Sequence, residues 1–533
     1  MLTPDGIHYA SLGKNIIELG TYHSNGSHFP DVIQPPLFPL IISLFYLVTK
    51  DPFISGFLVS SLFRALAIIP LFYLALKFFD RKTAITTSLL FIAHPLIFDS
   101  SILISTQPIY CFAFLLIVYL IFTFFQKMTK RGALLIGIGI GLAYCIRVEA
   151  FLLFIIFLSL LIFGDIRFRK KWRNIKYVFF CLIGLLIIYL PLTIFVYRQS
   201  NIMMPCPKIQ LILAHKKIWM ASESDSAFHH SSYTMKYQRA IFKYSPETNN
   251  LLANDILFNR KVDLPARPLS VNTISSGETS RFVSLKNTMK LIIHYFEVYF
   301  KNLLQLYRTI NHVRYFPPLL LPVLILGLIG QAWTEKCWKI NISLFWVIAV
   351  SSVFLFSHFS TRFFIPIVAI TMLWCAQGIT RFSQLIIDSF KHINLTVSNK
   401  LMLSLIVGVI LLSMVPSWIS VSRFNEEQMN GFKKIAKSIE AHVPSDAVVI
   451  SRLPQSSYLA KRHYAALPYL DFDELLKFTC KFSNCALVLS KQDESLRPEL
   501  SNQLWHVWQE NKLNSHKIIF EDDCAIVLFN HNN

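Results

Sequence analysis

The amino-acid sequence predicts an α-helical polytopic membrane protein with a small α/β domain at its C-terminal end. Of its 533 residues, 54% are hydrophobic and only 15% are charged, a balance that ordinary soluble domains do not have. Apolar segments of about the length of a membrane helix recur along the chain, about ten in all. Basic residues are concentrated in the short connectors between these segments, as in multi-pass membrane proteins.

The apolar segments give the order of the elements. Residues 1–35 are polar, and residues 36–49 are apolar but short for a crossing, so we expect a helix at the membrane interface there. Crossings are then expected at 53–76, 83–98, 108–125, 132–146, 150–163, 177–197, 317–333, 342–357, 363–379 and 401–420. Together they form a membrane domain over residues 1–420, with a first outer loop at 1–52 and a large outer loop at 198–316.

The basic connectors fix the orientation of the chain. They stay on one side of the membrane only if both short segments, 132–146 and 150–163, cross it as a hairpin. Basic loops mark the cytoplasm, so we expect a multi-pass protein of the inner (cytoplasmic) membrane with residues 421–533 on the periplasmic or outer side. The net charge of +20 is distributed over these loops, and nucleic-acid binding is not expected.

The segment after the last crossing alternates between helix and strand patterns. Residues 424–444 and 471–479 have helical patterns, while 447–451 and 485–490 resemble buried strands. Residues 421–533 are therefore predicted to be a small extracytoplasmic α/β domain. Within the large outer loop, residues 287–310 are apolar with a helical period, which is typical of a helix resting on the membrane.

The first outer loop contains an acidic residue suited to catalysis. Asp5 stands just outside the membrane, together with Tyr9 and Lys14. Its carboxylate suits a general base or a metal ligand for a phosphate leaving group. The alternative is that the pair Asp5-Gly6 caps a helix over Ile7–Leu19.

Ionisable residues also stand at three other outer boundaries. Asp99 suits a cation or a sugar hydroxyl, or is an exposed loop residue. Arg147 offers a forked donor to phosphate, unless it pairs with Glu149 or extends to the membrane interface. Arg362, close to His358, either binds an anion or anchors its helix at the interface. In a chain poor in charge, we expect these groups to converge on one anion site.

In order and position, these motifs resemble the GT-C class of membrane glycosyltransferases. Within it, they are most similar to the bacterial RgtA/B/C/D-like and protein-mannosyltransferase-like group, which includes the lipid A aminoarabinose transferase. The runs that carry the resemblance are DGIHYASLGKNIIELGTY (5–22), QPPLFPLIISLFYLVTKDP (34–52), SGFLVSSLFRALAIIPLFYLALKFFDRKTA (55–84), LLFIAHPLIFDSSILISTQPIY (89–110), GIGIGLAYCIRVEAFLL (137–153), STRFFIPIVAI (360–370) and DAVVISRLPQSSYLAKRHYAALPY (446–469).

The resemblance implies transfer of a sugar from a polyprenyl-phosphate donor to a lipid, glycan or protein acceptor on the outer face. Asp5 occupies the acidic position of the first loop, and Arg362, with Arg147 and Lys14, would hold the donor phosphate. The family often has Glu where this chain has Gln107, and the helix that precedes the first loop is expected to be missing. The cofactor stays open: Mg²⁺ or Mn²⁺ suits a carboxylate-rich site, whereas monophosphate donors need none in principle.

Two other classes of protein compete with this interpretation. A transporter or flippase for lipid-linked sugars would place ionisable residues near the bilayer midplane, often in repeated halves, and this chain does neither. A catalytically inactive relative that binds lipid carriers would retain the fold, and Gln107 is compatible with it.

Overall fold

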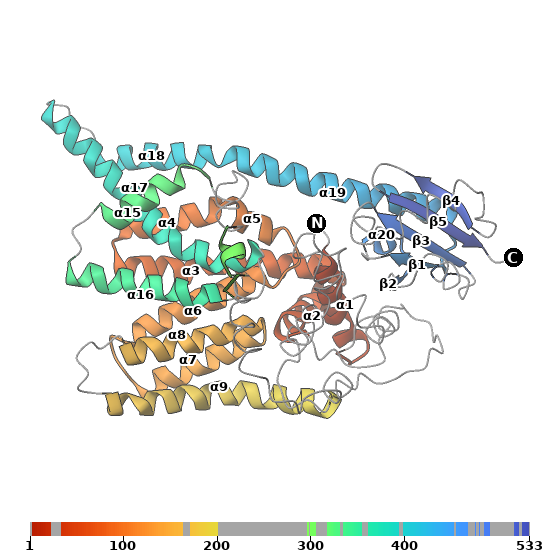
Figure 1. Cartoon of the computed structure of the whole chain (residues 1–533), viewed down its shortest axis with the longest axis horizontal. Helices are drawn as coiled ribbons and strands as arrows, with labels where there is room; N and C mark the ends of the chain where they lie inside the picture. Colours follow the sequence, from red (N-terminus) through yellow and green to blue (C-terminus); the bar gives the residue numbers. More distant parts are fainter. Residues whose placement is uncertain are drawn as a thin grey trace.

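A computed structural model describes the chain as a helical bundle joined by one long helix to a mixed β-sheet (Figure 1). It describes residues 3–22, 34–163, 171–200, 296–297, 299–304, 317–330, 334–353, 361–393, 398–451, 455–466, 475, 479, 484–490, 516–521 and 525–531.

The helices and strands have the following bounds. The first half contains α1 (Pro4–Glu18), α2 (Leu37–Thr49), α3 (Pro52–Phe78), α4 (Arg81–Ala93), α5 (Pro95–Ser101), α6 (Gln107–Phe124), α7 (Lys130–Tyr144), the 3₁₀ turn η1 (Val148–Ala150), α8 (Phe151–Phe163) and α9 (Lys171–Ser200). The second half contains α15 (Leu320–Ile329), α16 (Glu335–Ser351), η4 (Thr361–Phe364), α17 (Ile365–His392), α18 (Asn399–Ser413), α19 (Val415–His442), β1 (Val448–Ser451), α20 (Gln455–Leu459), β2 (His463–Ala466), β3 (Asn484–Ser490), β4 (His516–Glu521) and β5 (Ala525–His531).

Each predicted crossing falls on one helix of the bundle, or on two consecutive helices at 83–98 and 401–420. Among the described residues, five helices are long and apolar enough to cross a membrane, or six if the bent pair α4 and α5 counts as one span. The segments that we expected as the remaining crossings are shorter helices, among them α8, α15 and α16, which run alongside the long ones (Figure 1). The number of crossings stays a prediction, whereas the helical, membrane-spanning character of the fold is confirmed.

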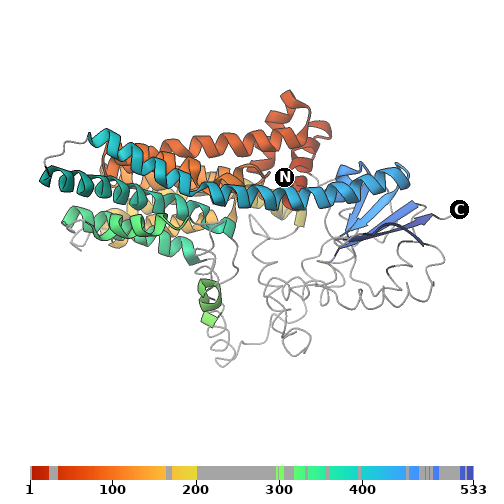
Figure 2. The ribbon, with the colours of Figure 1, turned by 90° about the horizontal axis from the view of Figure 1, so that it is seen from above.

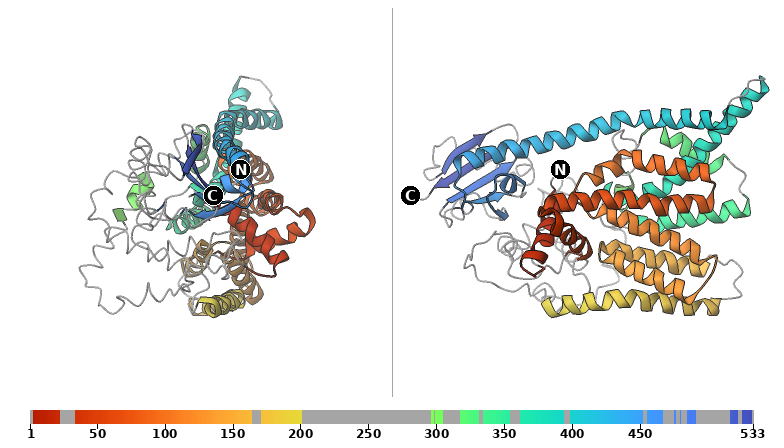
Figure 3. Two further views of the ribbon diagram at one scale, coloured as in Figure 1. Left: turned by 90° about the vertical axis from the view of Figure 1, so that its right-hand side faces the viewer. Right: turned by 180° about the vertical axis from the view of Figure 1, so that it is seen from behind.

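The described helix ends that carry the basic connectors gather at one end of the bundle (Figure 1). The C-terminal end of α3 meets the C-terminal end of α6 there, where Lys77 Nζ donates to Thr123 Oγ1 at 3.2 Å and to Gln126 Oε1 at 2.7 Å. The paired helices α1 and α2 lie across the opposite end, which faces the β-sheet (Figure 3). The first loop predicted to be outside thus lies at the end of the molecule that carries the sheet (Figure 3).

Glycines allow the helices of two pairs in the bundle to pack with their backbones in direct contact. A Cβ atom on Gly378 of α17 would lie 1.8 Å from the Val323 carbonyl oxygen of α15. A Cβ atom on Gly137 of α7 would lie 1.9 Å from the Cys181 carbonyl oxygen of α9. Small residues at such crossings give close van der Waals packing, which drives helix association in lipid.

We expect Gly378→Ala to destabilise the protein by about 1–3 kcal/mol, because α15 and α17 must separate to admit the methyl group. The check is the melting temperature of the purified protein in detergent, followed by size-exclusion chromatography. Gly408→Ala in α18 is the matched control, because a Cβ atom there meets nothing within 4 Å. Equal melting temperatures for the two variants would contradict the packing argument.

The predicted crossing at 83–98 is a broken helix. α4 and α5 meet at an angle of 58° at His94, because Pro95 cannot continue the hydrogen-bond ladder. Side chains of neighbouring helices satisfy the carbonyl groups that the break exposes. Arg64 of α3 donates to the Ile92 carbonyl oxygen, and Trp418 of α19 donates to that of Ala93 at 2.8 Å. Broken backbone inside a membrane domain requires such partners.

The end of the membrane domain differs from the sequence prediction. We expected a crossing at 401–420 and a separate helix at 424–444, but α18 and α19 follow each other directly from Asn399 to His442 (Figures 1 and 2). The predicted domain boundary at residue 421 falls inside α19. Apolar residues at 401–420 and an amphipathic pattern after them are both helix-compatible, so the chain does not break where its polarity changes.

The sheet confirms the predicted α/β character of the C-terminal region. Its strand order is β2-β1-β3-β5-β4, in which β1 pairs in parallel with β2 and β3, while β5 pairs antiparallel with β3 and β4. The predicted strands at 447–451 and 485–490 correspond to β1 and β3. Ile435, Ala436 and Ile439 of α19 pack on the sheet residues Val449 and Val488.

Some predicted elements lie largely outside the described residues. Of the large outer loop at 198–316, the described part includes residues 296–297 and 299–304, which are helical within the surface helix predicted at 287–310. Of the helix predicted at 471–479, Leu475 and Thr479 are described, and both are helical.

Candidate functional site

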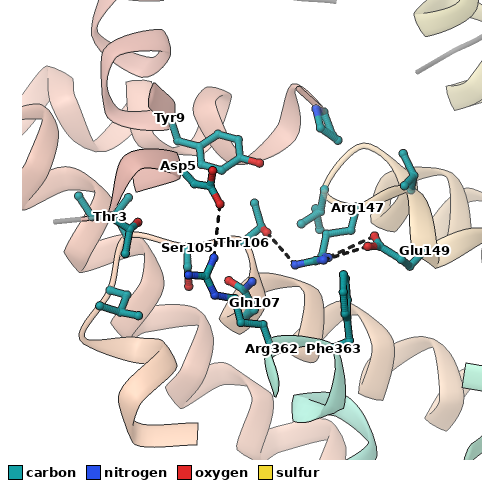
Figure 4. A pocket seen from close by; sticks show the side chains of 15 residues that line it. Thr3, Asp5, Tyr9, Ser105, Thr106, Gln107, Arg147, Glu149, Arg362 and Phe363 are labelled. Atoms are coloured by element: carbon teal, nitrogen blue, oxygen red, sulfur yellow. Dashed lines mark hydrogen bonds and ion pairs between the residues drawn. The ribbon is translucent and has the colours of Figure 1, made fainter. Parts of the chain in front are cut away.

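A polar cavity of about 210 Å³ opens at the end of the bundle that faces the sheet (Figure 4). Five chain segments line it: the start of α1, Pro35 before α2, the residues that lead into α6, the connection between α7 and α8, and η4. The lining residues that carry polar or charged side chains are Thr3, Asp5, Tyr9, Ser105, Thr106, Gln107, Arg147, Glu149 and Arg362. Most of the ionisable residues predicted to converge are therefore on one cavity.

Local sequence explains why Asp5 points into this cavity. Thr3 is the N-cap of α1, and its Oγ1 accepts from the Gly6 backbone N–H at 3.0 Å. Pro4 follows at the first helical turn, where its missing N–H costs nothing. The alternative that Asp5 caps a helix over Ile7–Leu19 is therefore wrong, because the helix begins earlier and Thr3 caps it. The Asp5 carboxylate is left available for tertiary contacts.

The tertiary contact of Asp5 is with Arg362. Arg362 Nη1 lies 3.4 Å from Asp5 Oδ2, although 357 positions separate the two residues in the sequence. The side chains are 64% and 46% exposed for Asp5 and Arg362, so this is a long, solvent-accessible ion pair at the edge of the cavity. Such pairs contribute little to stability and exchange partners readily.

Arg147 is bound very differently. Its Nη2 and Nε donate to the two oxygens of Glu149 at 2.9 and 3.2 Å, and its Nη1 donates to Thr106 Oγ1 at 3.3 Å. The guanidinium also stacks near Phe363, with its central carbon 5.0 Å from the ring centroid. The side chain is only 14% exposed. Burial alone would lower the pKa of Arg147, but the adjacent Glu149 carboxylate raises it above its ordinary value.

Through these contacts Arg147 holds three chain segments together. It joins the start of α6 through Thr106, the α7–α8 connection through Glu149, and η4 through Phe363, the neighbour of Arg362. Of the interpretations of Arg147, the geometry supports mutual pairing with Glu149. Arg362, by contrast, has a long and exposed ion pair with Asp5.

We expect Glu149→Ala to destabilise the protein by about 3 kcal/mol, because it leaves the Arg147 charge largely buried and without its bidentate partner. Replacing both residues, Arg147→Met with Glu149→Leu, should recover much of this loss. Thermal unfolding in nanodiscs measures both effects. Glu335→Ala, which removes the exposed partner of Lys339, is the control and should leave the melting temperature unchanged. A double variant no more stable than the single one would exclude the buried-charge explanation.

Two described residues among the predicted site residues, Lys14 and Asp99, do not line the cavity. Lys14 pairs with Glu18 on its own helix at 3.4 Å. Asp99 accepts a hydrogen bond from Asn425 Nδ2 of α19 at 2.9 Å. This contact connects α5 to the long helix, and Asp99 does not supply the cavity with a further carboxylate. His358 lies outside the described residues.

Three predicted supporting residues line the cavity, Tyr9, Gln107 and Glu149. Tyr9 donates its hydroxyl to Gln34 Oε1 at 2.9 Å, which connects α1 to the residues before α2. Gln107 is the first residue of α6 and is 6% exposed. Sequence reasoning missed Thr3, Ser105, Thr106 and Phe363. Thr3 followed by Pro4 is a recognisable helix start that would have revealed Thr3.

The comparisons with known proteins concern the family and the fold. Residues 33–195 match the family model described as dolichyl-phosphate-mannose-protein mannosyltransferase. No curated protein sequence matches the chain. The crystal structure of ArnT from Cupriavidus metallidurans in the apo state is similar, with a TM-score of 0.53 and 10% identity, and the match covers 98% of this chain and 93% of ArnT.

An archaeal structure is similar to the same extent. It is the oligosaccharyltransferase AglB from Archaeoglobus fulgidus in complex with an inhibitory peptide and a dolichol-phosphate. The TM-score is 0.53 at 13% identity, and the match covers 94% of this chain and 68% of AglB. At such identities the likeness establishes the fold. The chain therefore has the fold of the GT-C class of membrane glycosyltransferases, with the sequence pattern of the protein-mannosyltransferase-like family over residues 33–195.

Proposed function

We propose that the chain transfers a sugar from a polyprenyl-phosphate donor to a lipid, glycan or protein acceptor at the outer face of the inner membrane. The observation that carries this proposal is the Asp5–Arg362 pair, which places an exchangeable cation next to a carboxylate on one polar cavity. The fold supports it, since AglB, a protein of similar fold, is in complex with a dolichol-phosphate.

Arg362 is proposed to bind the donor phosphate. A sugar phosphodiester carries one negative charge and gains a second when the sugar leaves, so a fixed cation favours the transition state over the ground state. The phosphate competes with Asp5 for Arg362, and it wins readily because the existing pair is long and exposed. Arg147, held by Glu149 and Thr106, is proposed to keep the cavity wall next to Arg362 in place.

Asp5 is proposed to act as the general base once the phosphate has replaced it on Arg362. Its carboxylate takes the proton of an acceptor hydroxyl, the acceptor oxygen bonds to the anomeric carbon, and the bond from that carbon to the phosphate oxygen breaks. The electron pair stays with the departing polyprenyl phosphate. In this proposal Arg362, and not Mg²⁺ or Mn²⁺, neutralises the leaving group, because each cavity carboxylate already faces an arginine.

The test is reconstitution of the purified chain in nanodiscs with synthetic undecaprenyl phosphates that carry hexoses, pentoses or amino sugars. An extract of the host envelope serves as the source of acceptors. Mass spectrometry should detect release of undecaprenyl phosphate together with one sugar-sized increment on an acceptor. Flux of intact donor across proteoliposomes without a covalent product would instead identify a flippase. No product from any donor would contradict the proposal.

A further inference from the structure

The side chain of Gln107 has a hydrogen-bonding group with no partner in the described part of the chain. Gln107 begins α6, is 6% exposed, and lines the cavity beside Arg362 (Figure 4). Its Oε1 is fully enclosed and accepts no hydrogen bond from any described residue. Buried amide oxygens in folded proteins nearly always have a donor, so this one requires an explanation.

Three donor groups of the cavity already have acceptors elsewhere. Arg362 directs Nη1 to Asp5, and Ser105 donates its hydroxyl to the Ser100 carbonyl oxygen at 3.1 Å. The Tyr9 hydroxyl donates to Gln34. The Ser105 and Tyr9 hydroxyls would each have to leave their present acceptor to satisfy Gln107 Oε1, whereas a donor supplied by a ligand requires no such exchange.

We infer that Gln107 binds a hydroxyl group of the sugar that is transferred, an assignment that rests on the proposed function. A sugar hydroxyl can donate to Oε1 and accept from the amide Nε2–H, which uses both halves of the side chain. The oxygens of an ionised phosphodiester can only accept, and they would be repelled by Oε1. Gln107 therefore identifies the sugar side of the cavity, and Arg362 beside it identifies the phosphate side.

The absence of a charge on the Gln107 side chain supports its assignment to the sugar. The cavity carboxylates Asp5 and Glu149 each face an arginine. The resembling family often has Glu at this position, but in this cavity a carboxylate would stand beside Arg362 and compete with the donor phosphate. An amide of the same shape offers the acceptor oxygen without that competition.

The experiment compares two ligands in nanodiscs: undecaprenyl phosphate alone, and undecaprenyl phosphate carrying glucose, mannose or 4-amino-arabinose. Affinities are measured for the wild type, Gln107→Ala, Gln107→Glu and Gln384→Ala. Gln384 is the matched control, since it is an exposed glutamine of α17 that bonds to Asp388 outside the cavity. Donors lacking single hydroxyls then show which hydroxyl is bound.

For the sugar that the wild type prefers, we expect Gln107→Ala to weaken binding about tenfold, the equivalent of one lost hydrogen bond. Binding of undecaprenyl phosphate alone should stay unchanged. Gln107→Glu should weaken both ligands through its charge, and Gln384→Ala should weaken neither. One deoxy sugar should bind the wild type about tenfold more weakly than the parent sugar does. The same deoxy sugar and its parent should bind Gln107→Ala with equal affinity.

Three results would overturn the inference. Equal weakening of both ligands by Gln107→Ala would indicate a structural role, and no weakening would exclude any contact with the ligand. A wild type that binds no sugar-bearing carrier more tightly than the bare one would also exclude it. Failure of the proposed function is distinguishable, because then Arg362→Ala would leave the affinity for undecaprenyl phosphate alone unchanged.

Discussion

Arg362→Ala is expected to reduce kcat/KM for sugar transfer by about 10²–10³-fold, the loss typical of one preorganised charge donor at a transition state. The same substitution should weaken binding of undecaprenyl phosphate by about tenfold or more, because charge-assisted hydrogen bonds to the phosphate disappear. Arg362→Lys should recover part of both losses, since the ammonium group keeps the charge but not the fork geometry. Steady-state kinetics in nanodiscs and equilibrium binding measure the two effects.

The control for Arg362 is an arginine of equal charge away from the cavity. Arg423 is an exposed residue of α19, and Arg423→Ala should leave both kinetics and carrier binding unchanged. Because the Asp5–Arg362 pair is largely exposed, Arg362→Ala should also leave the melting temperature close to that of the wild type. Wild-type turnover in this variant would contradict the assignment of Arg362 to the leaving phosphate.

Asp5→Asn is expected to act in opposite directions on turnover and on binding. Turnover should fall by about 10²–10⁴-fold, the range for loss of a general base. Binding of undecaprenyl phosphate should become tighter, because asparagine keeps the shape of the side chain but no longer competes with phosphate for Arg362. Single-turnover kinetics with a labelled donor, together with binding of the bare carrier, separate the two effects.

Asp388→Asn removes an exposed carboxylate of α17 and serves as the control for Asp5. It should change neither quantity. If Asp5→Asn weakened carrier binding together with turnover, the carboxylate would be shaping the cavity and would not be competing with phosphate. An unchanged turnover would favour another base and remove Asp5 from the proposed reaction.

Much of the membrane architecture was predictable from local patterns. The alternation of apolar segments with basic connectors identified the helices of the bundle and the end that carries the polar loops. The pattern at 447–451 and 485–490 identified β1 and β3. The close spacing of Arg147 and Glu149 placed both residues in one short connection, where they do form an ion pair. Each of these features depends on residues that are near one another in the sequence.

Other features could not be predicted because they depend on contacts between distant segments. The division at residue 421 follows a change in polarity, but packing of α19 against the sheet and against α5 keeps the helix continuous. Asp99 stands at a helix end beside the other candidates, yet Asn425 of α19 accounts for its carboxylate. The Lys14–Glu18 pair, by contrast, is one helical turn apart and was recognisable from the sequence.

The sequence by itself determined which segments form apolar helices, which end of the bundle is polar and which residue types are available there, because hydrophobic partition and helical period are local properties. Only the tertiary structure decided the pairing of Asp5 with Arg362, the commitment of Arg147 to Glu149 and Thr106, and the unpartnered oxygen of Gln107. These depend on how five chain segments pack around one cavity, and no local pattern encodes a contact between residues 357 positions apart.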